Sequence, residues 1–357
     1  MKVKPVFDAL AALGARTALV HTGQHYDPRM SDVFFSDLGM APPDEHLEVG
    51  SGTHAEQTAR VMVAFEPVLE RRRPDIVVVV GDVNSTMACA LVAAKAGALV
   101  AHVEAGLRSR DWSMPEEVNR VVTDRVSDYL FAPSGDAADN LVAEGYRADQ
   151  IHLVGNVMVD TLLANLERAK RRPVLEELGL EAKGYGLVTL HRPSTVDVPA
   201  TLAEVLGALR GVAKDCPLVF PVHPRTRHAI ATIGPLPGVR LIEPVGYLDF
   251  IGLEAQALLV LTDSGGVQEE TTVLGVPCLT LRENTERPIT VTEGTNRLVG
   301  TTAETIVAGA RLALVQQVEL RRPHLWDGHA GQRIADVLLN TPGSSPPLRP
   351  TSVTPGR

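Results

Sequence analysis

The sequence predicts an α/β protein made of two Rossmann-like, doubly wound domains. Short apolar runs alternate with amphipathic stretches along the chain. Most of these runs are continuously apolar, which is typical of parallel strands that are covered on both faces. The repeated strand–helix order therefore indicates parallel sheets with helices on both sides. A chain of 357 residues is long enough for two such domains.

The first half of the chain predicts a helix followed by a strand–helix series. Apolar residues at helical spacing predict helices at Lys2–Leu13, Ala55–Glu70 and Ser85–Ala96. Continuous apolar runs predict strands at Thr17–His21, Ile76–Val80, Ala98–His102, Tyr129–Ala132 and Ile151–Val154. No strand precedes the first helix, so the first sheet is expected to lack the strand that would normally open it.

A break in the pattern over Arg168–Gly184, which contains Lys-Arg-Arg-Pro, separates the two halves. We therefore expect an N-terminal domain over 1–168 and a second domain over 169–324. The second domain predicts a helix at Ala200–Lys214 and strands at Gly186–Leu190, Leu218–Val222, Val239–Ile242, Leu258–Leu261 and Cys278–Leu281. The segment 341–357 is rich in Pro, Gly and Ser and is expected to be disordered.

Composition argues against several classes of function. The net charge of −9 disfavours nucleic acid or an anionic membrane as the main partner. Cys89, Cys216 and Cys278 lie far apart in apolar contexts without zinc spacing, so we expect reduced core residues in a cytoplasmic protein. No apolar run approaches the length of a membrane span, and the N-terminus has no signal-peptide pattern. No metal site and no cofactor are expected.

Polar and titratable residues follow six of the predicted strands, a placement that a purely structural protein does not need. Ligands of open parallel sheets bind beyond the carboxyl ends of the strands, so these residues are candidates for a site. The six segments are His21–His25, Gly81–Asn84, Val103–Gly106, His191–Pro193, His223–Arg225 and Asp263–Gly265.

The segment Thr262–Glu270 predicts a phosphate site. It follows the apolar run Ala257–Leu261 and reads Thr-Asp-Ser-Gly-Gly-Val-Gln-Glu-Glu, so a strand turns directly into a helix. Free N–H groups at the helix N-terminus, together with two glycines, favour a bound anion. Glu269 or Glu270 could reach a ribose hydroxyl, and Arg287, in a later loop of mixed charge, is expected to contact substrate. The alternative for Thr262–Glu270 is a tight strand–helix turn without a ligand, and the alternative for the loop of Arg287 is a solvated surface loop.

Two carboxylates at strand ends are candidates for acid–base chemistry. Asp82 could instead cap a helix, although Asn84 or Ser85 could do so equally well. A carboxylate at the position of Glu104, at the end of a buried strand, needs a partner, and Arg108 is the structural candidate.

Four further residues have weaker signals. Glu116 and Glu117 follow Pro115 at a predicted helix start, where acidic residues ordinarily complement the helix dipole. His191 and His223 end consecutive strands, each with an arginine close behind, which suggests a cationic pocket for a phosphate ligand. Each histidine alone is more often structural.

Two other motifs are rejected. Gly50–Ala55 has the GxGxxA outline of a dinucleotide site, but Asp44–Val49 before it is no buried strand. His21 and His25 have the spacing of a helical zinc pair, but the intervening Thr-Gly opposes a helix.

Taken in order along the chain, eight motifs resemble the non-hydrolysing UDP-N-acetylglucosamine 2-epimerase family. The motifs are Val80–Thr86, His102–Arg108, Pro115–Arg120, Gly155-Asn156, His191-Arg192, Pro221–Pro224, Thr262–Glu270 and Thr285–Pro288. Each motif is weak alone, but the ordered set is specific, and the resemblance extends from Lys2 to Leu339. It implies the GT-B architecture, in which two Rossmann-like domains face each other across a ligand cleft and a C-terminal helix, here 325–340, returns to the first domain.

The resemblance also implies a reaction, the reversible interconversion of UDP-GlcNAc and UDP-ManNAc as a supply of polysaccharide precursor. UDP is eliminated to give 2-acetamidoglucal and is added back with a proton on the opposite face, which needs acid–base groups on both faces of C2. The matching catalytic residues are Asp82, Glu104, Glu116 and His191. The matching substrate-binding residues are Lys2, Phe250, Ser264, Gly265, Gly266, Glu270 and Arg287. Positions that match a second, activating UDP-GlcNAc site are Gln24, Arg60, Arg192 and His223.

One departure and several alternatives accompany this interpretation. The family opens with a strand and a Gly-Thr-Arg-Pro-Glu loop, whereas this sequence starts inside the following helix, so we expect the strand and its substrate arginine to be absent and activity to be reduced. A GT-B glycosyltransferase, a hydrolysing epimerase and a catalytically impaired nucleotide-sugar binder remain possible. A 3-acetamido uronic acid relative of UDP-GlcNAc would fit the same motifs. A homodimer is expected, without a nucleic-acid or membrane partner.

Overall fold

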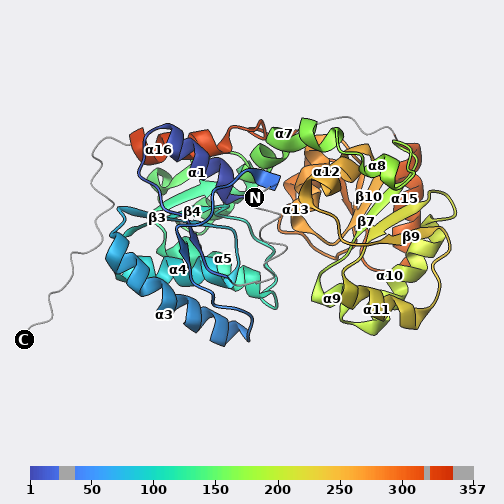
Figure 1. The fold of residues 1–357 in the computed structure, drawn as a ribbon, viewed down its shortest axis with the longest axis horizontal. Helices are drawn as coiled ribbons and strands as arrows, with labels where there is room; N and C mark the ends of the chain where they lie inside the picture. The colour runs from blue at the N-terminus through green and yellow to red at the C-terminus, as the bar shows by residue number, and fades with distance from the viewer. Residues whose placement is uncertain (24–36, 317–321, 341–357) are drawn as a thin grey trace, which may run out of the picture. The chain divides into compact units, whose positions relative to one another are not determined.

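The computed structural model describes residues 1–23, 37–316 and 322–340, which fall into two compact units. Unit 1 comprises 1–23, 41–157 and 329–340, and unit 2 comprises 37–40, 158–316 and 322–328 of the described residues. Each unit has helices on both faces of a parallel sheet, as Figure 1 shows. The predicted fold class, with two Rossmann-like α/β domains, is confirmed.

The sheet of unit 1 has the order β3-β4-β5-β6, and all of its neighbouring strands are parallel. The strands are β3 (Ile76–Val80), β4 (Leu99–Val103), β5 (Tyr129–Ala132) and β6 (Ile151–Leu153). A separate parallel pair consists of β1 (Val20–His21) and β2 (Glu45–His46). The first predicted strand is therefore shorter than expected, and β2 was not predicted.

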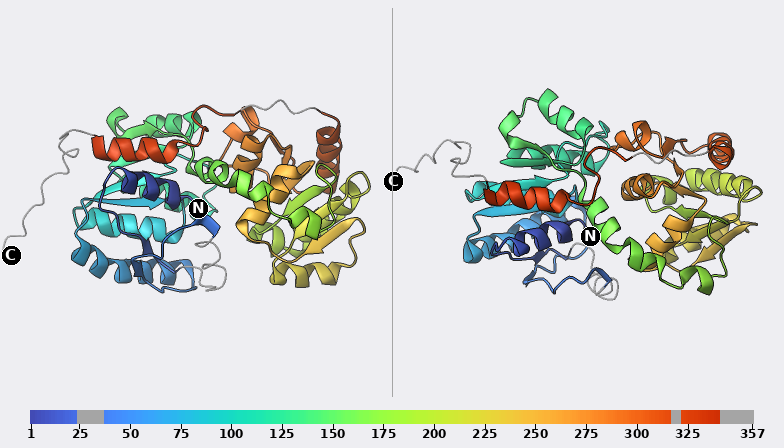
Figure 2. Two further views of the ribbon diagram at one scale, coloured as in Figure 1. Left: turned by 45° about the horizontal axis from the view of Figure 1, so that its top comes forward. Right: turned by 90° about the horizontal axis from the view of Figure 1, so that it is seen from above.

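The helices of unit 1 cover the two faces of this sheet. The helices α1 (Val3–Ala12) and α16 (Ala330–Asn340) pack side by side on one face, as Figures 1 and 2 show. The other face carries α3 (His54–Arg72), α4 (Asn84–Lys95) and α5 (Pro115–Val126), with α6 (Gly135–Ala143) and the 3-10 turn η1 (Ala148–Gln150) near β5 and β6. Successive side chains along each strand point to opposite faces of the sheet, so every strand contributes residues to the cores on both faces. Val77 and Val79 point to the α3–α4 side, whereas Val103 packs with α1 and α16.

The sheet of unit 2 has the order β12-β11-β10-β7-β8-β9, again fully parallel. The strands are β7 (Gly186–Thr189), β8 (Leu218–Pro221), β9 (Val239–Ile242), β10 (Leu259–Thr262), β11 (Cys278–Thr280) and β12 (Asn296–Leu298). This is the Rossmann order, in which the chain direction across the sheet reverses between β7 and β10. The carboxyl ends of those two strands are therefore the expected ligand position of this unit.

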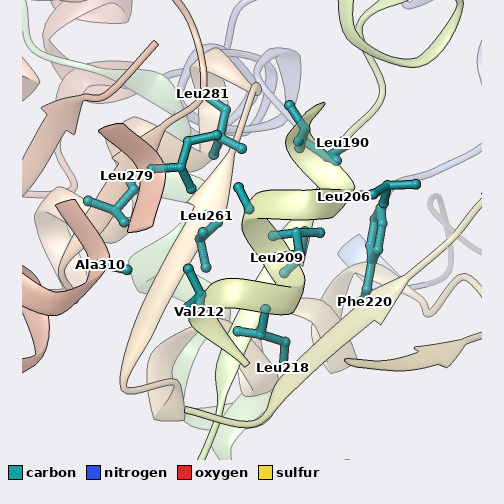
Figure 3. Packing of buried hydrophobic residues seen from close by; sticks show 14 of the residues in the cluster. Leu190, Leu206, Leu209, Val212, Leu218, Phe220, Leu261, Leu279, Leu281 and Ala310 are labelled. Atoms are coloured by element: carbon teal, nitrogen blue, oxygen red, sulfur yellow. The ribbon is translucent and has the colours of Figure 1, made fainter. Parts of the chain in front are cut away.

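The largest core cluster lies between this sheet and the helices α10 (Pro199–Val212) and α15 (Ala303–Val315). Figure 3 shows Leu206 and Leu209 of α10 facing Leu261 of β10. The remaining helices of unit 2 are α7 (Val157–Lys170), α8 (Val174–Glu177), α9 (Pro193–Val196), α11 (Pro224–Ile233), α12 (Tyr247–Gln256), α13 (Gly265–Leu274) and α14 (Ile289–Thr292).

Two expectations from composition concern the described residues as a whole. Cys89, Cys216 and Cys278 are buried and carry free thiols, as predicted. Within 1–23, 37–316 and 322–340, no helix combines the length and the apolar character that a membrane crossing requires. The predicted tail 341–357 lies outside the described residues.

Candidate functional site

The switch point of unit 2 is organised around Asp263, a fully buried carboxylate directly after β10. Its side chain accepts hydrogen bonds from the backbone N–H groups of His191 (3.1 Å) and Arg192 (3.0 Å), and lies 3.0 Å from His191 Nδ1. Burial alone would raise the pKa of Asp263, but His191 and the two N–H groups outweigh burial and lower it. Asp263 thus binds the loop after β7 to the turn after β10. The 60% exposed His191 side chain stays accessible.

The predicted anion turn begins α13. Ser264 is the N-cap residue, and its hydroxyl makes no capping bond, so the first N–H groups of this 10-residue helix are not capped by that side chain. Gly265 is closely covered, because a Cβ at this position would lie 2.6 Å from Arg287 Nη1. Glu286 Oε1 lies almost as close to that position, at 2.7 Å. Backbone donors and the helix dipole favour an anion at this turn, and the Arg287 guanidinium beside it is paired with the Glu286 carboxylate.

Arg287 is 4% exposed, so the alternative of a solvated surface loop is wrong for this residue. Its Nε lies 2.7 Å from a Glu269 oxygen, and its Nη1 lies 2.5 Å from Glu286. Glu286 also pairs with Arg192 at 3.3 Å and with Arg282 at 2.8 Å. The network fixes the side chains of Arg192 and Arg287 beside the α13 turn before any ligand binds, which reduces the conformational entropy lost on binding.

Glu270 lies one turn further along α13. It is buried and accepts a hydrogen bond of 3.1 Å from the Tyr247 hydroxyl. Burial raises the pKa of Glu270 to about 7, while the bond from Tyr247 opposes this rise. Phe250 is half-buried on α12, the helix that also carries Tyr247. His223 is exposed and follows β8, the neighbour of β7, so the two predicted histidines do end adjacent strands.

The carboxylates of unit 1 occupy the turns after β3 and β4. Glu104 is 3% exposed at its side chain, and its Oε2 lies 2.5 Å from Lys2 Nζ. Its Oε1 has no hydrogen-bond partner among the described residues. A Cβ on Gly81 would lie 3.5 Å from both Lys2 Nζ and Glu104 Oε2, so the structure places Lys2 and Glu104 beside the turn that carries Asp82.

Arg120, a fully buried residue of α5, connects two acidic residues. Its Nε and Nη2 donate to Asp82 Oδ2 at 3.0 and 2.7 Å, and its Nη1 donates to Glu117 Oε2 at 2.7 Å. Glu117 also accepts from the backbone N–H groups of Ser109 and Arg110, which makes it a structural anchor. Glu116 precedes it in the first turn of α5 and is half-exposed, so it is the more accessible of the two acids.

Two structural alternatives in unit 1 prove wrong. Arg108 does not pair with Glu104; it lies 2.7 Å from both Asp124 and Glu144. Neither Asn84 nor Ser85 caps α4, because the helix begins at Asn84 and its N-cap residue is Val83.

The residues expected to form an activator site are spread over both units. Gln24 lies outside the described residues. Arg60 binds the backbone of the loop before α3, with 3.0 Å to Val49 O and 3.2 Å to Ser51 O. Arg192 belongs to the network around Glu286. The described contacts therefore place Arg192, but not Arg60, next to residues of the predicted substrate site.

Sequence reasoning gave no role to several residues that organise these sites, namely Asp124, His102 and Arg120 in unit 1 and Glu286 and Tyr247 in unit 2. Asp263 was one of the strand-end candidates, but its contact with His191 was not predicted. A signal was available, because a carboxylate that directly follows a fully apolar strand needs buried partners.

These features define a doubly wound α/β protein with a glycine-rich helix N-terminus beside Arg287 in one unit and carboxylates at the strand ends of the other. The model of the UDP-N-acetylglucosamine 2-epimerase family matches residues 9–339, and the chain belongs to this family. A UDP-N-acetylglucosamine 2-epimerase of Methanocaldococcus jannaschii is 42% identical over 350 residues, which is 95% of either chain.

Two further comparisons bear on the ligand. A UDP-2,3-diacetamido-2,3-dideoxy-D-glucuronate 2-epimerase of Pseudomonas aeruginosa is 44% identical over 324 residues, 90% of either chain. The crystal structure of the Methanocaldococcus jannaschii UDP-GlcNAc 2-epimerase in complex with UDP-GlcNAc and UDP matches with a TM-score of 0.88 at 42% identity, covering 94% of this chain and 95% of that one. The family and the enzyme class predicted from the sequence are confirmed.

Proposed function

We propose that this protein interconverts UDP-GlcNAc and UDP-ManNAc by inverting C2 of the sugar. The observation that carries the proposal is the α13 turn, where Ser264, Gly265 and Gly266 lie at the Rossmann switch point with Arg287 over Gly265. Such a turn suits a diphosphate. Glu270 is the proposed acceptor for a ribose hydroxyl and Phe250 the proposed contact for the uracil, roles that the family resemblance supports.

The proposed route is an elimination followed by re-addition. A carboxylate removes the proton from C2, a C1–C2 double bond forms, and the electron pair of the C1–O bond leaves with UDP. The oxygen of UDP then returns to C1 while a proton is delivered to the opposite face of C2. Asp82, Glu104 and Glu116 are the proposed acid–base groups, and Lys2 and Glu104 share a short ion pair of 2.5 Å. His191 assists the departing diphosphate, because its exposed ring is oriented by Asp263.

Nuclear magnetic resonance of UDP-GlcNAc in D₂O tests this proposal without any acceptor sugar. We expect UDP-ManNAc signals to appear and deuterium to enter C2 in both sugars. Retention of the original C2 hydrogen, or no new sugar nucleotide, would refute the proposal. Release of free ManNAc would indicate a hydrolysing enzyme, and calorimetric binding without turnover would indicate a nucleotide-sugar binder.

A second substrate deserves the same assay because of the 44% identity to the epimerase named for UDP-2,3-diacetamido-2,3-dideoxy-D-glucuronate. The two substrates are distinguished by the ratio of their kcat/KM values. We expect UDP-GlcNAc to give the higher value, and the reverse order would assign the chain to the uronate reaction.

Two finer points belong to the same proposal. A second UDP-GlcNAc is proposed to activate the enzyme through Gln24, Arg60, Arg192 and His223, which predicts sigmoidal kinetics in UDP-GlcNAc. The active form is proposed to be a homodimer, which light scattering of the purified protein measures directly. Hyperbolic kinetics would contradict the first point, and a monomeric mass would contradict the second.

A further inference from the structure

The two turns that carry carboxylates in unit 1 are connected by one buried pair, His102 and Asp124. His102 lies on β4 and Asp124 on α5, and both are fully buried. The ring Nδ1 lies 2.6 Å from Asp124 Oδ1, and the ring Nε2 lies 2.9 Å from Gly81 O, one residue before Asp82. Asp124 Oδ2 accepts the backbone N–H of Gly106, two residues after Glu104, at 3.1 Å.

The atoms around the His102 ring determine which groups donate in these hydrogen bonds. A carbonyl oxygen and a carboxylate oxygen only accept, so both ring nitrogens of His102 must donate for both bonds to form. Asp124 has a third partner, the charged Arg108, whose Nη2 lies 2.7 Å away and also pairs with Glu144. Burial would raise the pKa of Asp124, but His102 and Arg108 outweigh burial and lower it. The carboxylate therefore stays ionised and holds three groups of the stretch 102–108, which contains Glu104.

The turn after β4 needs such support because its backbone conformation is unusual. Glu104 has a φ of 73°, in the left-handed region that disfavours a residue with a side chain. Gly106 has a φ of 81°, and a Cβ there would collide with the carbonyl group of Ala137. The turn is thus a specific conformation, and a shift in it would move Glu104 relative to Asp82.

We propose that His102 and Asp124 are positioning residues for the proposed epimerisation, because they fix the turn of Asp82 and the turn of Glu104 to each other. The inference rests on the proposed function. Neither residue touches the reacting atoms, since both are buried; they act by holding the two carboxylates in register. A displacement of about 1 Å in such a group can reduce a rate roughly 100-fold.

A matched control separates positioning from general stability. Asp128, a buried residue just after α5, accepts the backbone N–H of Val100 at 2.8 Å. Asp124 and Asp128 thus each bind one backbone N–H associated with β4, but Asp124 does so at the carboxyl end and Asp128 near the start. Replacement of either Asp by Asn removes a buried carboxylate from the same region.

The experiment compares Asp124→Asn with Asp128→Asn in the full chain. For Asp124→Asn we expect a kcat that falls roughly 100-fold, with an unchanged Kd for UDP, because the UDP site is proposed for unit 2. Asp128→Asn should lower the unfolding midpoint less, because Asp124 also pairs with the buried His102 and Arg108, and should keep the wild-type kcat. Wild-type kcat in Asp124→Asn, or an equal loss of kcat in both variants, would overturn the proposal.

A second measurement works without turnover. In uniformly ¹⁵N-labelled protein both ring nitrogens of His102 should carry hydrogens, and the amide signals of Asp82 and Glu104 should shift in Asp124→Asn but not in Asp128→Asn. If wild-type protein lacked epimerase activity, the proposed function would fail and these signals would still decide the positioning role. If Asp124→Asn did not fold, His102→Gln replaces it with the same expected results, and unshifted signals there would count against the proposal.

Discussion

Glu254 should make unit 2 less stable as the pH rises, and Glu254→Met should remove this effect. Glu254 is a fully buried residue of α12, and neither of its carboxyl oxygens has a hydrogen-bond partner among the described residues. Burial raises its pKa well above the ordinary value, and the neighbouring Glu270 raises it further. The other titratable groups around it are Tyr247 and Cys278, whose own pKa values are raised by burial and by Glu254.

The magnitude follows from linkage. The folded chain binds the proton of Glu254 more tightly than the unfolded chain, so this stabilising contribution is complete below the unfolded pKa of about 4.3 and is lost as the pH rises toward the folded pKa. The loss is about 1.4 kcal/mol per pH unit, or up to ~3 kcal/mol between pH 5 and pH 7. Methionine has a similar volume and no group to satisfy, so it additionally removes a buried unpartnered polar group that costs about 1–3 kcal/mol.

Urea unfolding of wild type, Glu254→Met and Glu254→Gln at pH 5, 6 and 7 separates the two contributions. The Met variant should gain stability over wild type at every pH, with the largest gain at pH 7. The Gln variant should lose the part of the pH slope that Glu254 contributes but keep the cost of a buried polar group, while Glu270, whose pKa burial raises to about 7, keeps its own part of the slope. The reasoning is refuted if the wild-type and Met curves stay parallel across this range, or if Glu254→Met is the less stable protein at pH 7.

Three further predictions concern the sites. Asp82→Asn should reduce kcat by roughly 10²–10⁴-fold with an unchanged calorimetric Kd for UDP, and a large loss of UDP affinity would contradict a catalytic role. Gly265→Ala should weaken UDP binding about tenfold or more, because its Cβ would lie 2.6 Å from Arg287 Nη1, whereas Gly207→Ala, which meets open space in α10, should leave UDP binding unchanged; equal effects would contradict this. Tyr247→Phe removes the hydrogen bond that lowers the pKa of Glu270, so the pH midpoint of UDP affinity should move above that of wild type, and an unmoved midpoint would exclude Glu270 as the ribose contact.

The fold was predictable because parallel strands buried on both faces leave an unmistakable pattern. The prediction is confirmed end to end for β3 and β9, and within one residue at each end for β4 and β10. The two missed strands have no such pattern. The strand β2 is only two residues long, and β12 reads Asn-Arg-Leu, so both are defined by hydrogen bonds to neighbours that a local apolar signal does not reveal.

The location of the sites was predictable, but the pairing within them was not. Strand ends converge at one edge of a parallel sheet, so Asp82, Glu104 and Ser264 could be singled out from their positions alone. Partner choice depends on contacts between distant segments. Glu104 pairs with Lys2, 102 residues away, although Arg108 is only four residues distant in the sequence. Side chains four residues apart are regular neighbours on a helix, and this turn is not helical.

Each unit contains a histidine–aspartate contact near its strand ends, His102–Asp124 in unit 1 and His191–Asp263 in unit 2. The two pairs differ in the solvent exposure of the histidine ring. In each unit a buried aspartate keeps a lowered pKa despite burial. Asp124, on α5, contacts the His102 ring and the Gly106 N–H. Asp263, after β10, contacts the His191 ring and the His191 N–H. His102 is fully buried, so its ring can hold neighbouring segments in place but cannot contact a ligand. His191 is 60% exposed at its side chain, so Asp263 orients a ring that is accessible to a ligand. The chemistry of a histidine–aspartate pair alone therefore does not identify a catalytic residue; solvent access to the ring distinguishes the proposed catalytic histidine from the proposed positioning histidine.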